Sequence, residues 1–533
     1  MQPRSSPSPR PRQGEGWVAS ALDRSTAPFG VGGYVHHGVA SSYVDGVPRG
    51  WSERAAQGSQ FMEMFKLARC VYEGTACDLP GVGIKYDSFV PAMWSAVRSG
   101  HVSAWAAEFV AQGLRWGFEA GLKPAAIPPG VRMFRNYPSA TGEFRDRVSM
   151  ATEARCAAGR TIDLGEWLAD MRAQVQEIFG DFFLFPLGAV AKALEWWSAR
   201  PTDDHTRTGL NAAVDMTDLA HSLDSYAQIA RLLLPGFNMH VSDVEAAFPM
   251  LPWAPWLWPR FFHRFYPGPG QPLHLYCHIN GDFGTRGLPG AFKIFFVDVV
   301  IPMARAAMVI HLPMEVYVDD LGHIGPSSSA VRSDMLAFQD WARSICGVEF
   351  KRIKDRHAAQ VQLMLGFWWD SFERTRTLEE KKLHMYMAML LEFSERRSLT
   401  LRERQQVAGR LQRAVLTMPP GAACLLANLF LLMAGLSLAW HKRRTTRAER
   451  TDYRYFHDIL ASFSGRGYFA FDRFTRGPMV LSDASKSREY TGGGWCSSDG
   501  RADYFRYGTS AARQPIDFLE GEESISTPTA SHG

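Results

Sequence analysis

Two adjacent acids, Asp319 and Asp320, follow a short run of alternating apolar residues that begins at Met314. Residues 314, 316 and 318 alternate as in a half-buried strand, and residues 321–324 would return as its hairpin partner, which places both acids at the turn. A solvated turn is the plainer interpretation, because Asp is a common turn residue. Carboxylates paired in an apolar setting, however, repel each other and resist ionisation unless a cation neutralises them. A metal site is therefore the sharper hypothesis.

A third acid, Asp243, ends another predicted strand that begins at Met239, and Phe248 follows five residues later. Phosphoryl transfer uses two divalent ions roughly 3.5–4 Å apart, which hold the attacking and leaving oxygens. Carboxylates from two different strands supply the hard oxygen ligands that such ions prefer. Alone, Asp243 would be an ordinary residue at a strand end; together with Asp319 and Asp320 it completes a candidate metal-binding set.

These segments resemble the conserved motifs of reverse transcriptases. Tyr317-Val-Asp-Asp320 resembles motif C, and Asp243 to Phe248 resembles motif A. The remaining matches are Gly284 to Phe292 with motif B, Gly347 to Lys354 with motif D, and Leu365-Gly366-Phe367 with motif E, the primer grip. Five elements stand in the family's order over residues 182–372. Within the family the chain is most similar to DIRS-like elements, with gypsy-like elements as the alternative.

The resemblance implies an RNA-directed DNA polymerase of a retrotransposable element. Its partners would be an RNA template, a DNA primer or RNA–DNA hybrid, and deoxynucleoside triphosphates. Asp243, Asp319 and Asp320 would hold two Mg²⁺ ions, for which Mn²⁺ can substitute, and these would activate the primer 3′-hydroxyl. Lys354 would protonate or neutralise the departing pyrophosphate, with Lys351 as the alternative if the register differs. The rival hypothesis is a decayed or domesticated relic that binds nucleic acid without copying it.

The same resemblance assigns roles in substrate binding. Phe248 would be the steric gate that leaves no room for a 2′-hydroxyl. Gly284 would let the backbone approach the new base pair, and Pro289 would open the following helix at its first turn. Leu365 and Gly366 would belong to the primer grip.

In the fingers, the family places a Lys and an Arg that hold the triphosphate, followed by an Asp and an Asn. Lys192 and Arg200 fit this order best, because Arg grips phosphate in a fork and Lys acts as a point charge. A rival register uses Asp215 as the acid, but Asn211 then occupies the position of the arginine. The family's second Lys is missing, since an alanine follows Lys192.

Near the C-terminus, residues 479–485 with 492–495 resemble the first strand of RNase H. Asp483 matches the first of the four metal-binding carboxylates of that domain, and Glu520 fits the second. The third and fourth would lie beyond residue 533. We therefore expect a truncated RNase H-like α/β segment without RNase H activity of its own.

The predicted fold is α+β, a right-hand polymerase with fingers, palm and a helical thumb or connection. Residues 89–121 have the apolar spacing of a helical pair. We expect five segments: a disordered arm at 1–16, a mostly helical region at 17–180, fingers and palm at 181–372, a helical thumb and connection at 373–475, and the RNase H-like segment at 476–533.

Composition excludes several other classes. The 533 residues are 46% apolar and carry a net charge of only +4, so contacts with nucleic acid must come from local basic patches. Seven scattered cysteines without a CxxC pair argue against a disulfide scaffold and a zinc site, and they suit a reducing interior. The first 16 residues contain no apolar segment of a signal peptide. We expect a protein of the cytoplasm, the nucleus or both; its oligomeric state stays open.

One apolar stretch allows two interpretations. Residues 422–440 are nineteen residues without a charge, and His441, Lys442, Arg443 and Arg444 follow. The length and the flanking charge permit a membrane helix. Because polar residues and a glycine interrupt the stretch and Pro-Pro-Gly precedes it, we expect a buried helix and no membrane partner.

Overall fold

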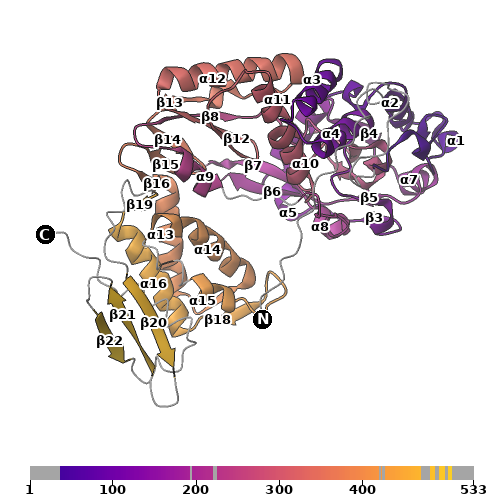
Figure 1. The fold of residues 1–533 in the computed structure, drawn as a ribbon. Coiled ribbons are helices and arrows are strands. Elements are labelled where there is room, and N and C mark those ends of the chain that lie inside the picture. Colours follow the sequence, from indigo (N-terminus) through magenta and orange to yellow (C-terminus); the bar gives the residue numbers. More distant parts are fainter. Residues whose placement is uncertain are drawn as a thin grey trace, which may run out of the picture.

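A computed structural model of the chain describes residues 36–469, with gaps at 193–194, 220–224, 419–421 and 423–425, and three strands beyond them at 480–486, 491–497 and 502–506. Figure 1 shows a large body, in which most of the labelled helices and strands lie, and a smaller helical body beneath it, drawn in orange. The Glu520 prediction lies outside the described residues.

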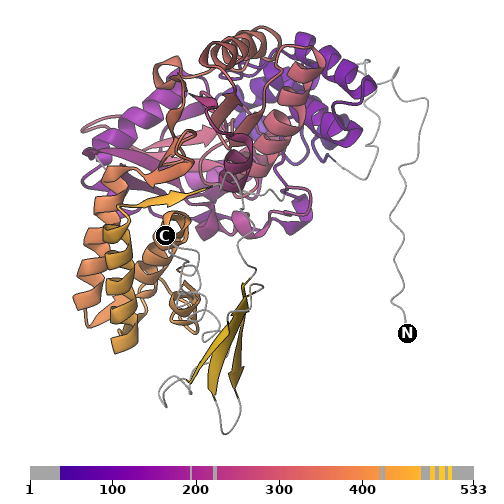
Figure 2. The same ribbon diagram turned by 60° about the vertical axis from the view of Figure 1, so that its left-hand side comes forward.

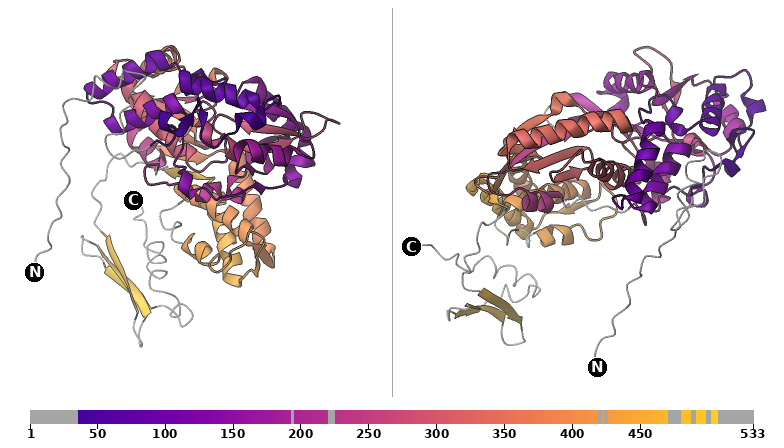
Figure 3. Two further views of the ribbon diagram at one scale, coloured as in Figure 1. Left: turned by 90° about the vertical axis from the view of Figure 1, so that its right-hand side faces the viewer. Right: turned by 45° about the horizontal axis from the view of Figure 1, so that its top comes forward.

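The sheet that carries the three candidate acids has four antiparallel strands in the order β11-β12-β8-β13. Their bounds are β8 (Asn238–Asp243), β11 (Met314–Tyr317), β12 (Asp320–Gly325) and β13 (Arg356–Ala359). Helix α12 (Ser328–Trp341) contacts β8, β12 and β13 and lies across one face of the sheet (Figures 1 and 3). The predicted hairpin at residues 314–324 and the predicted strand that ends at Asp243 are both confirmed.

A second sheet has five strands in the order β3-β5-β9-β10-β4, and a separate hairpin pairs β6 with β7. Strands from both sides of residue 180 join this sheet, so the helical region before it and the segment after it share one structure. The bounds are β3 (Arg132–Met133), β4 (Thr161–Glu166), β5 (Phe183–Leu184), β6 (Leu187–Lys192), β7 (Glu195–Asp203), β9 (Phe262–Phe265) and β10 (His274–His278).

Helices surround these two sheets. The bounds are α1 (Glu53–Ala56), α2 (Met62–Glu73), α3 (Tyr86–Arg98), α4 (Ala104–Trp116), α5 (Pro138–Thr141), α6 (Arg145–Ala157), α7 (Met171–Phe179), α8 (His205–Thr208), α9 (Ser225–Leu232), α10 (Leu288–Lys293) and α11 (Ile301–Ala306), with the short strands β1 (Tyr43–Val44) and β2 (Val47–Pro48) before them. The predicted helical pair at 89–121 is confirmed as α3 and α4. Phe89 of α3 stacks on Phe295. Both residues belong to one hydrophobic core, which therefore includes the helical pair.

The helical body begins with the sheet β14-β15-β16-β19. A separate core holds this sheet and four helices together, and the orange helices pack side by side in Figure 2. The bounds are β14 (Val361–Met364), β15 (Phe367–Asp370), β16 (Thr375–Leu378), α13 (Glu380–Glu395), β17 (Ser398–Thr400), α14 (Leu401–Ala414), α15 (Leu426–Leu431), β18 (Lys442–Arg444), α16 (Arg447–Ser462) and β19 (Arg466–Tyr468).

The expectation of one buried helix over residues 422–440 is wrong. In the described part of this stretch only α15 is helical, and a turn follows it, with Gly435 at a φ of +74°. Leu431 and Trp440 are 66% and 70% exposed. A left-handed glycine ends helical geometry, and apolar composition alone does not reveal that the side chains after it face outward. No helix among the described residues is long and apolar enough to cross a membrane.

A buried ion pair joins α14 to α16. Arg404 donates to both carboxylate oxygens of Glu449, at 2.9 and 3.2 Å, and both residues are 1% exposed. We expect Arg404→Met to destabilise the helical body by about 3–5 kcal/mol, because it leaves the Glu449 carboxylate buried without its counter-charge. Denaturant unfolding measures this loss. The double variant with Glu449→Leu should recover most of it; an equal or larger loss would contradict the explanation.

The last described strands, β20 (Val480–Lys486), β21 (Thr491–Ser497) and β22 (Ala502–Arg506), form an antiparallel sheet. Asp483 lies on β20, opposite Gly494. The predicted strand around Asp483 is thus confirmed, while its role as an RNase H carboxylate stays a prediction.

Candidate active site

The turn between β11 and β12 carries Asp319 and holds Val318 in an unusual backbone conformation. Tyr317 pairs with Asp320, which leaves Val318 and Asp319 as the two turn residues. Val318 has a φ of +58°, which a β-branched residue rarely adopts. Such a conformation costs on the order of 1–3 kcal/mol and persists only where the surroundings impose it. This turn brings both acids to the end of the sheet.

The register of the sheet brings Asp320 beside Asp243. The two residues lie directly opposite each other on the neighbouring antiparallel strands β12 and β8. The backbone N–H of Val244, immediately after β8, donates to the carbonyl oxygen of Asp319 at 2.8 Å. The three acids that the sequence separates by 77 positions are therefore adjacent in the structure, at the same edge of the sheet.

The surroundings of these acids disfavour their charged forms. Burial raises the pKa of Asp319, and the nearby Asp243 raises it further. Burial, Asp319 and Asp243 together raise the pKa of Asp320 to about 6. Carboxylates placed together and shielded from water respond in this way when no cation neutralises them. The cluster is therefore electrostatically suited to receive cations.

Two lysines of the segment directly before β13 contact the Asp243 carboxylate. Lys354 Nζ donates to Asp243 Oδ2 at 2.7 Å, and Lys351 Nζ lies 3.1 Å from Oδ1. Lys354 is the residue predicted to act on the departing pyrophosphate, and Lys351 is its alternative. Both reach the same acid, so the geometry is compatible with either register.

The arrangement of the three acid side chains bears on whether they could hold metal ions. Among the described residues, no three Asp, Glu, His or Cys side chains are already disposed as a metal-binding group. The buried Oδ1 atom of Asp243 accepts no hydrogen bond and has only the ion pair with Lys351. Three hard-oxygen donors at one edge, with raised pKa values for two of them, fit divalent cations chemically. Side-chain rotation away from the lysines would have to accompany binding.

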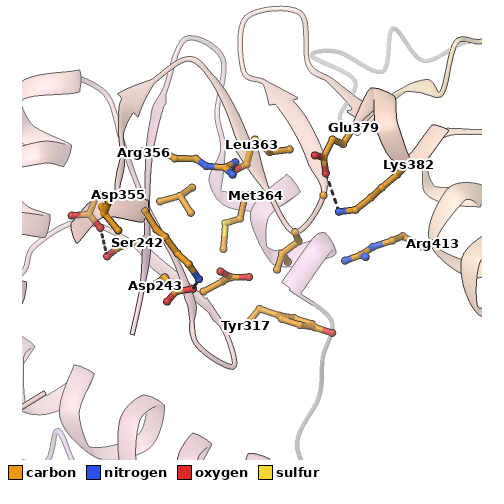
Figure 4. A pocket seen from close by; sticks show the side chains of 16 residues that line it. Ser242, Asp243, Tyr317, Asp355, Arg356, Leu363, Met364, Glu379, Lys382 and Arg413 are labelled. Atoms are coloured by element: carbon orange, nitrogen blue, oxygen red, sulfur yellow. Dashed lines mark hydrogen bonds and ion pairs between the residues drawn. The ribbon is translucent and has the colours of Figure 1, made fainter. Parts of the chain in front are cut away.

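A cavity of about 640 Å³ opens beside these acids. Asp243, Asp320 and Lys354 line it, together with Lys382 of α13 and Arg413 of α14. Figure 4 shows Asp243 on one side of the cavity and Lys382 and Arg413 on the other. The cavity therefore lies between the β11-β12-β8-β13 sheet and the helical body. Its lining combines carboxylates with cationic side chains.

The predicted primer-grip residues form the turn between β14 and β15 and line the same cavity. Leu365 and Gly366 have φ values of +53° and +80°, the pattern of a two-residue type I′ hairpin. A Cβ added to Gly366 would lie 2.2 Å from Lys382 Nζ. The atom that this Cβ would meet is the flexible end of the Lys382 side chain, and the role of Leu365 and Gly366 in a primer grip stays a prediction.

Gly284 lies in the loop before α10, and Pro289 lies within this helix. A Cβ at Gly284 would lie 1.8 Å from the carbonyl oxygen of Asp203, so the missing side chain is required for packing against the end of β7. Close approach of a base pair at Gly284 stays a prediction. Pro289 lies in the first turn of α10, as predicted. Asn211 joins this loop by donating to Gly284 O at 2.9 Å and accepting from Arg286 N at 2.8 Å.

Phe248 lies on the loop after β8 and is partly buried. Its ring packs against Phe292 at a centroid distance of 6.0 Å and against Phe283 at 5.5 Å. Phe283 is 61% exposed and directly precedes Gly284, but sequence reasoning did not single it out. The available signal was its position directly before Gly284, the first residue of the segment that resembles motif B. The rings of Phe248 and Phe283 together form an aromatic surface, called the aromatic floor below.

A second cavity, of about 270 Å³, lies beyond this floor. Arg155, Arg160 and Lys351 contribute three cationic groups to its lining. Arg155 contacts Asp203 at 3.4 Å, whereas the buried Nε of Arg160 has no hydrogen-bond partner. Sequence reasoning missed both arginines, because nothing local to α6 signals that its end reaches motif A.

The predicted fingers cations occupy one hairpin. Lys192 ends β6, and Arg200 lies in β7 opposite Val190. Arg200 is exposed and lines neither of the two cavities above. Asp215, the acid of the rival register, instead pairs with Lys123 at 2.6 Å. The choice between the two registers stays a prediction.

Comparison with known proteins gives structural likeness only. No protein-family model matches the sequence, and no curated protein is significantly similar to it. The chain is similar to a foamy viral protease-reverse transcriptase in complex with an RNA/DNA hybrid, with a TM-score of 0.47, 12% identity, and coverage of 83% of this chain and 54% of that one. Two double-stranded DNA complexes of foamy viral protease-reverse transcriptase give TM-scores of 0.46 and 0.45, identities of 13% and 14%, and coverage of 74% and 73% of this chain and 61% and 71% of those chains. The chain thus spans 61% and 54% of the first two of these structures.

Proposed function

We propose that the chain is an RNA-directed DNA polymerase of a retrotransposable element, DIRS-like or gypsy-like. One observation carries the proposal: Asp320 lies directly opposite Asp243, with Asp319 in the adjoining turn, beside a cavity large enough for the end of a primer. Acids from two strands that meet at one point are the arrangement that two-metal nucleotidyl transfer needs.

Asp243, Asp319 and Asp320 would hold two Mg²⁺ ions, or Mn²⁺, which when bound lower the barrier by activating the primer 3′-hydroxyl and stabilising the leaving group. Lys354, now 2.7 Å from Asp243, is close enough to neutralise or protonate the departing pyrophosphate. The chain's own contribution is to hold these charges in place before the substrate arrives, so that little reorganisation is needed during reaction.

The incoming deoxynucleoside triphosphate would lie over the aromatic floor. Phe248 would block a 2′-hydroxyl, and the exposed ring of Phe283 would support the sugar. Phe283 also lines the second cavity, where Arg160 and Lys351 would receive phosphate oxygens. Lys192 and Arg200 would complete the clamp if the β6–β7 hairpin closes.

The primer end would occupy the larger cavity. Leu365 and Gly366 present the hairpin turn to it, and Lys382 and Arg413 add cations from the two helices opposite. Phosphate contacts of this kind fix position without reading sequence. An RNA–DNA hybrid would continue from there along the helical body.

Primer extension tests the proposal. With a homopolymer RNA template, a complementary DNA primer, the matching dNTP and Mg²⁺, we expect a ladder of extended primers that a chelator abolishes. The alternative, a decayed relic that only binds nucleic acid, predicts salt-dependent binding of the same duplex without any extension. Binding and extension measured on one preparation separate the two.

A further inference from the structure

The segment that carries Lys351 and Lys354 has few packing contacts that fix its position. It enters at Lys351, whose N–H donates to the Asp243 carbonyl at 2.9 Å, and it leaves at Arg356, which pairs with Val241 of β8. Between these points runs a single 3₁₀ turn, Arg352–Lys354. None of its three residues is buried, and Ile353 is 98% exposed. No packed side chain therefore fixes this turn.

A buried set of hydrogen bonds follows the turn immediately. The Ser242 hydroxyl donates to Asp355 Oδ1 at 2.7 Å. Gln339 Nε2 donates to Ser242 Oγ at 2.9 Å and to Asp355 Oδ2 at 3.0 Å. Gln339 and Ser242 are 0% and 1% exposed. Because a carboxylate only accepts hydrogen bonds, the Gln339 amide must present its NH₂ group here.

These three residues come from three separate elements that meet behind the catalytic acids. Gln339 belongs to α12, Ser242 precedes Asp243 in β8, and Asp355 directly follows Lys354. The other tie between α12 and the turn is the Arg352–Asp340 ion pair, which is about half exposed on both sides and so contributes little. The buried set is the main anchor that α12 provides.

We propose that Gln339, Ser242 and Asp355 form a latch that keeps Lys354 within reach of the reacting phosphates. This inference rests on the proposed function. Lys354 is anchored to Asp243 in this structure, but a cation bound by Asp243 would compete for the same carboxylate. The latch holds the turn from the opposite side of β8, so Lys354 stays near the site when that ion pair is given up. Gln339 is thus a positioning residue that touches no substrate.

The test is a double-mutant cycle between Gln339→Leu and Lys354→Met, read as the single-turnover rate of nucleotide incorporation. Leu keeps the volume of the buried side chain and removes both donated hydrogen bonds. We expect Gln339→Leu to slow incorporation roughly tenfold, with unchanged affinity for template–primer and for dNTP. In the Lys354→Met background the same change should have less than about a twofold effect, because the positioned group is already gone. If the double variant loses rate by the product of the two single-variant losses, the latch is overturned.

Asp334→Asn is the matched control. Asp334 lies on the same helix and ties it to His323 of β12 at 2.8 Å, without contacting the turn. The double variant Asp334→Asn/Lys354→Met should lose rate by the product of the losses of the two single variants, whatever the size of the Asp334→Asn loss. Should Gln339→Leu fail to fold, Ser242→Ala interrupts the same set with a smaller change and carries the same expectation.

A second readout needs no activity. Hydrogen–deuterium exchange of the peptide that spans residues 351–356 should be roughly tenfold faster in Gln339→Leu than in the wild type, and unchanged in Asp334→Asn. Equal exchange in all three proteins would overturn the latch. A wild type that extends no primer would instead defeat the proposed function, and the exchange comparison would still decide the latch.

Discussion

Replacing Asp320 by asparagine is expected to lower the rate of nucleotide incorporation by roughly a thousandfold or more, with template–primer affinity nearly unchanged. Asparagine keeps the size of the side chain but removes one of the three charges at the end of the β8–β12 pair. The loss should appear in the chemical step, because metal-assisted stabilisation is strongest in the transition state. Asp319→Asn should behave in the same way.

Single-turnover extension and duplex binding measured side by side check this prediction. Asp458→Asn, which removes a 75% exposed carboxylate on α16, is the control and should retain the wild-type rate. Retained extension in Asp320→Asn would remove the catalytic assignment. Lost duplex binding would show that the residue acts through folding.

Phe248→Val is expected to relax selection between deoxyribonucleotides and ribonucleotides by about 10- to 200-fold, since steric discrimination in a pocket is worth roughly 1–3 kcal/mol. The ring packs between Phe283 and Phe292 and cannot turn aside without losing these contacts. Valine opens space where the 2′-hydroxyl would lie.

The measurement is the ratio of kcat/KM for dNTP and rNTP with the same template–primer. Phe372→Val, a change at a 71% exposed phenylalanine, should leave the ratio unchanged. If the ratio also stays unchanged in Phe248→Val, Phe248 is a packing residue and the match with motif A is misplaced.

Local patterns predicted the elements that carry the site. Alternating apolar residues before Asp319 indicated the hairpin, and the strand that ends at Asp243 followed from the same period. Pro289 located the first turn of α10 correctly. These features depend on residues within a few positions of each other, so the sequence displays them directly.

Long-range features were less accessible. Asp320 lies opposite Asp243, and not opposite a neighbouring residue, because of the strand register. This register is set by packing between segments 77 positions apart. Arg155 and Arg160 line a cavity together with Glu245 and Ala246, which lie about 85–90 positions later in the chain. The Gln339 anchor likewise requires α12 to lie on β8 at one particular offset. The spacing of residues within one segment does not predict these contacts between distant segments.

The stretch at 422–440 shows the opposite error. Its apolar composition predicted a buried helix, but the chain turns after α15 and exposes Leu431 and Trp440. Hydrophobicity indicates where burial is favourable, whereas the partner surface decides whether it happens. Here α15 contributes Leu426 and Leu429 to the core of the helical body, beside residues of α13, α14 and α16.

The most direct test of the central claim is single-nucleotide addition on an RNA template of defined sequence, with each of the four dNTPs supplied alone and Mg²⁺ present. The account predicts that only the complementary dNTP extends the primer, by one nucleotide, and that one pyrophosphate is released for each primer extended. Chelation of the metal, or Asp243→Asn, should abolish both products while the duplex stays bound. A chain that binds the primed RNA template yet adds no nucleotide, or adds nucleotides without regard to the template base, would contradict the account.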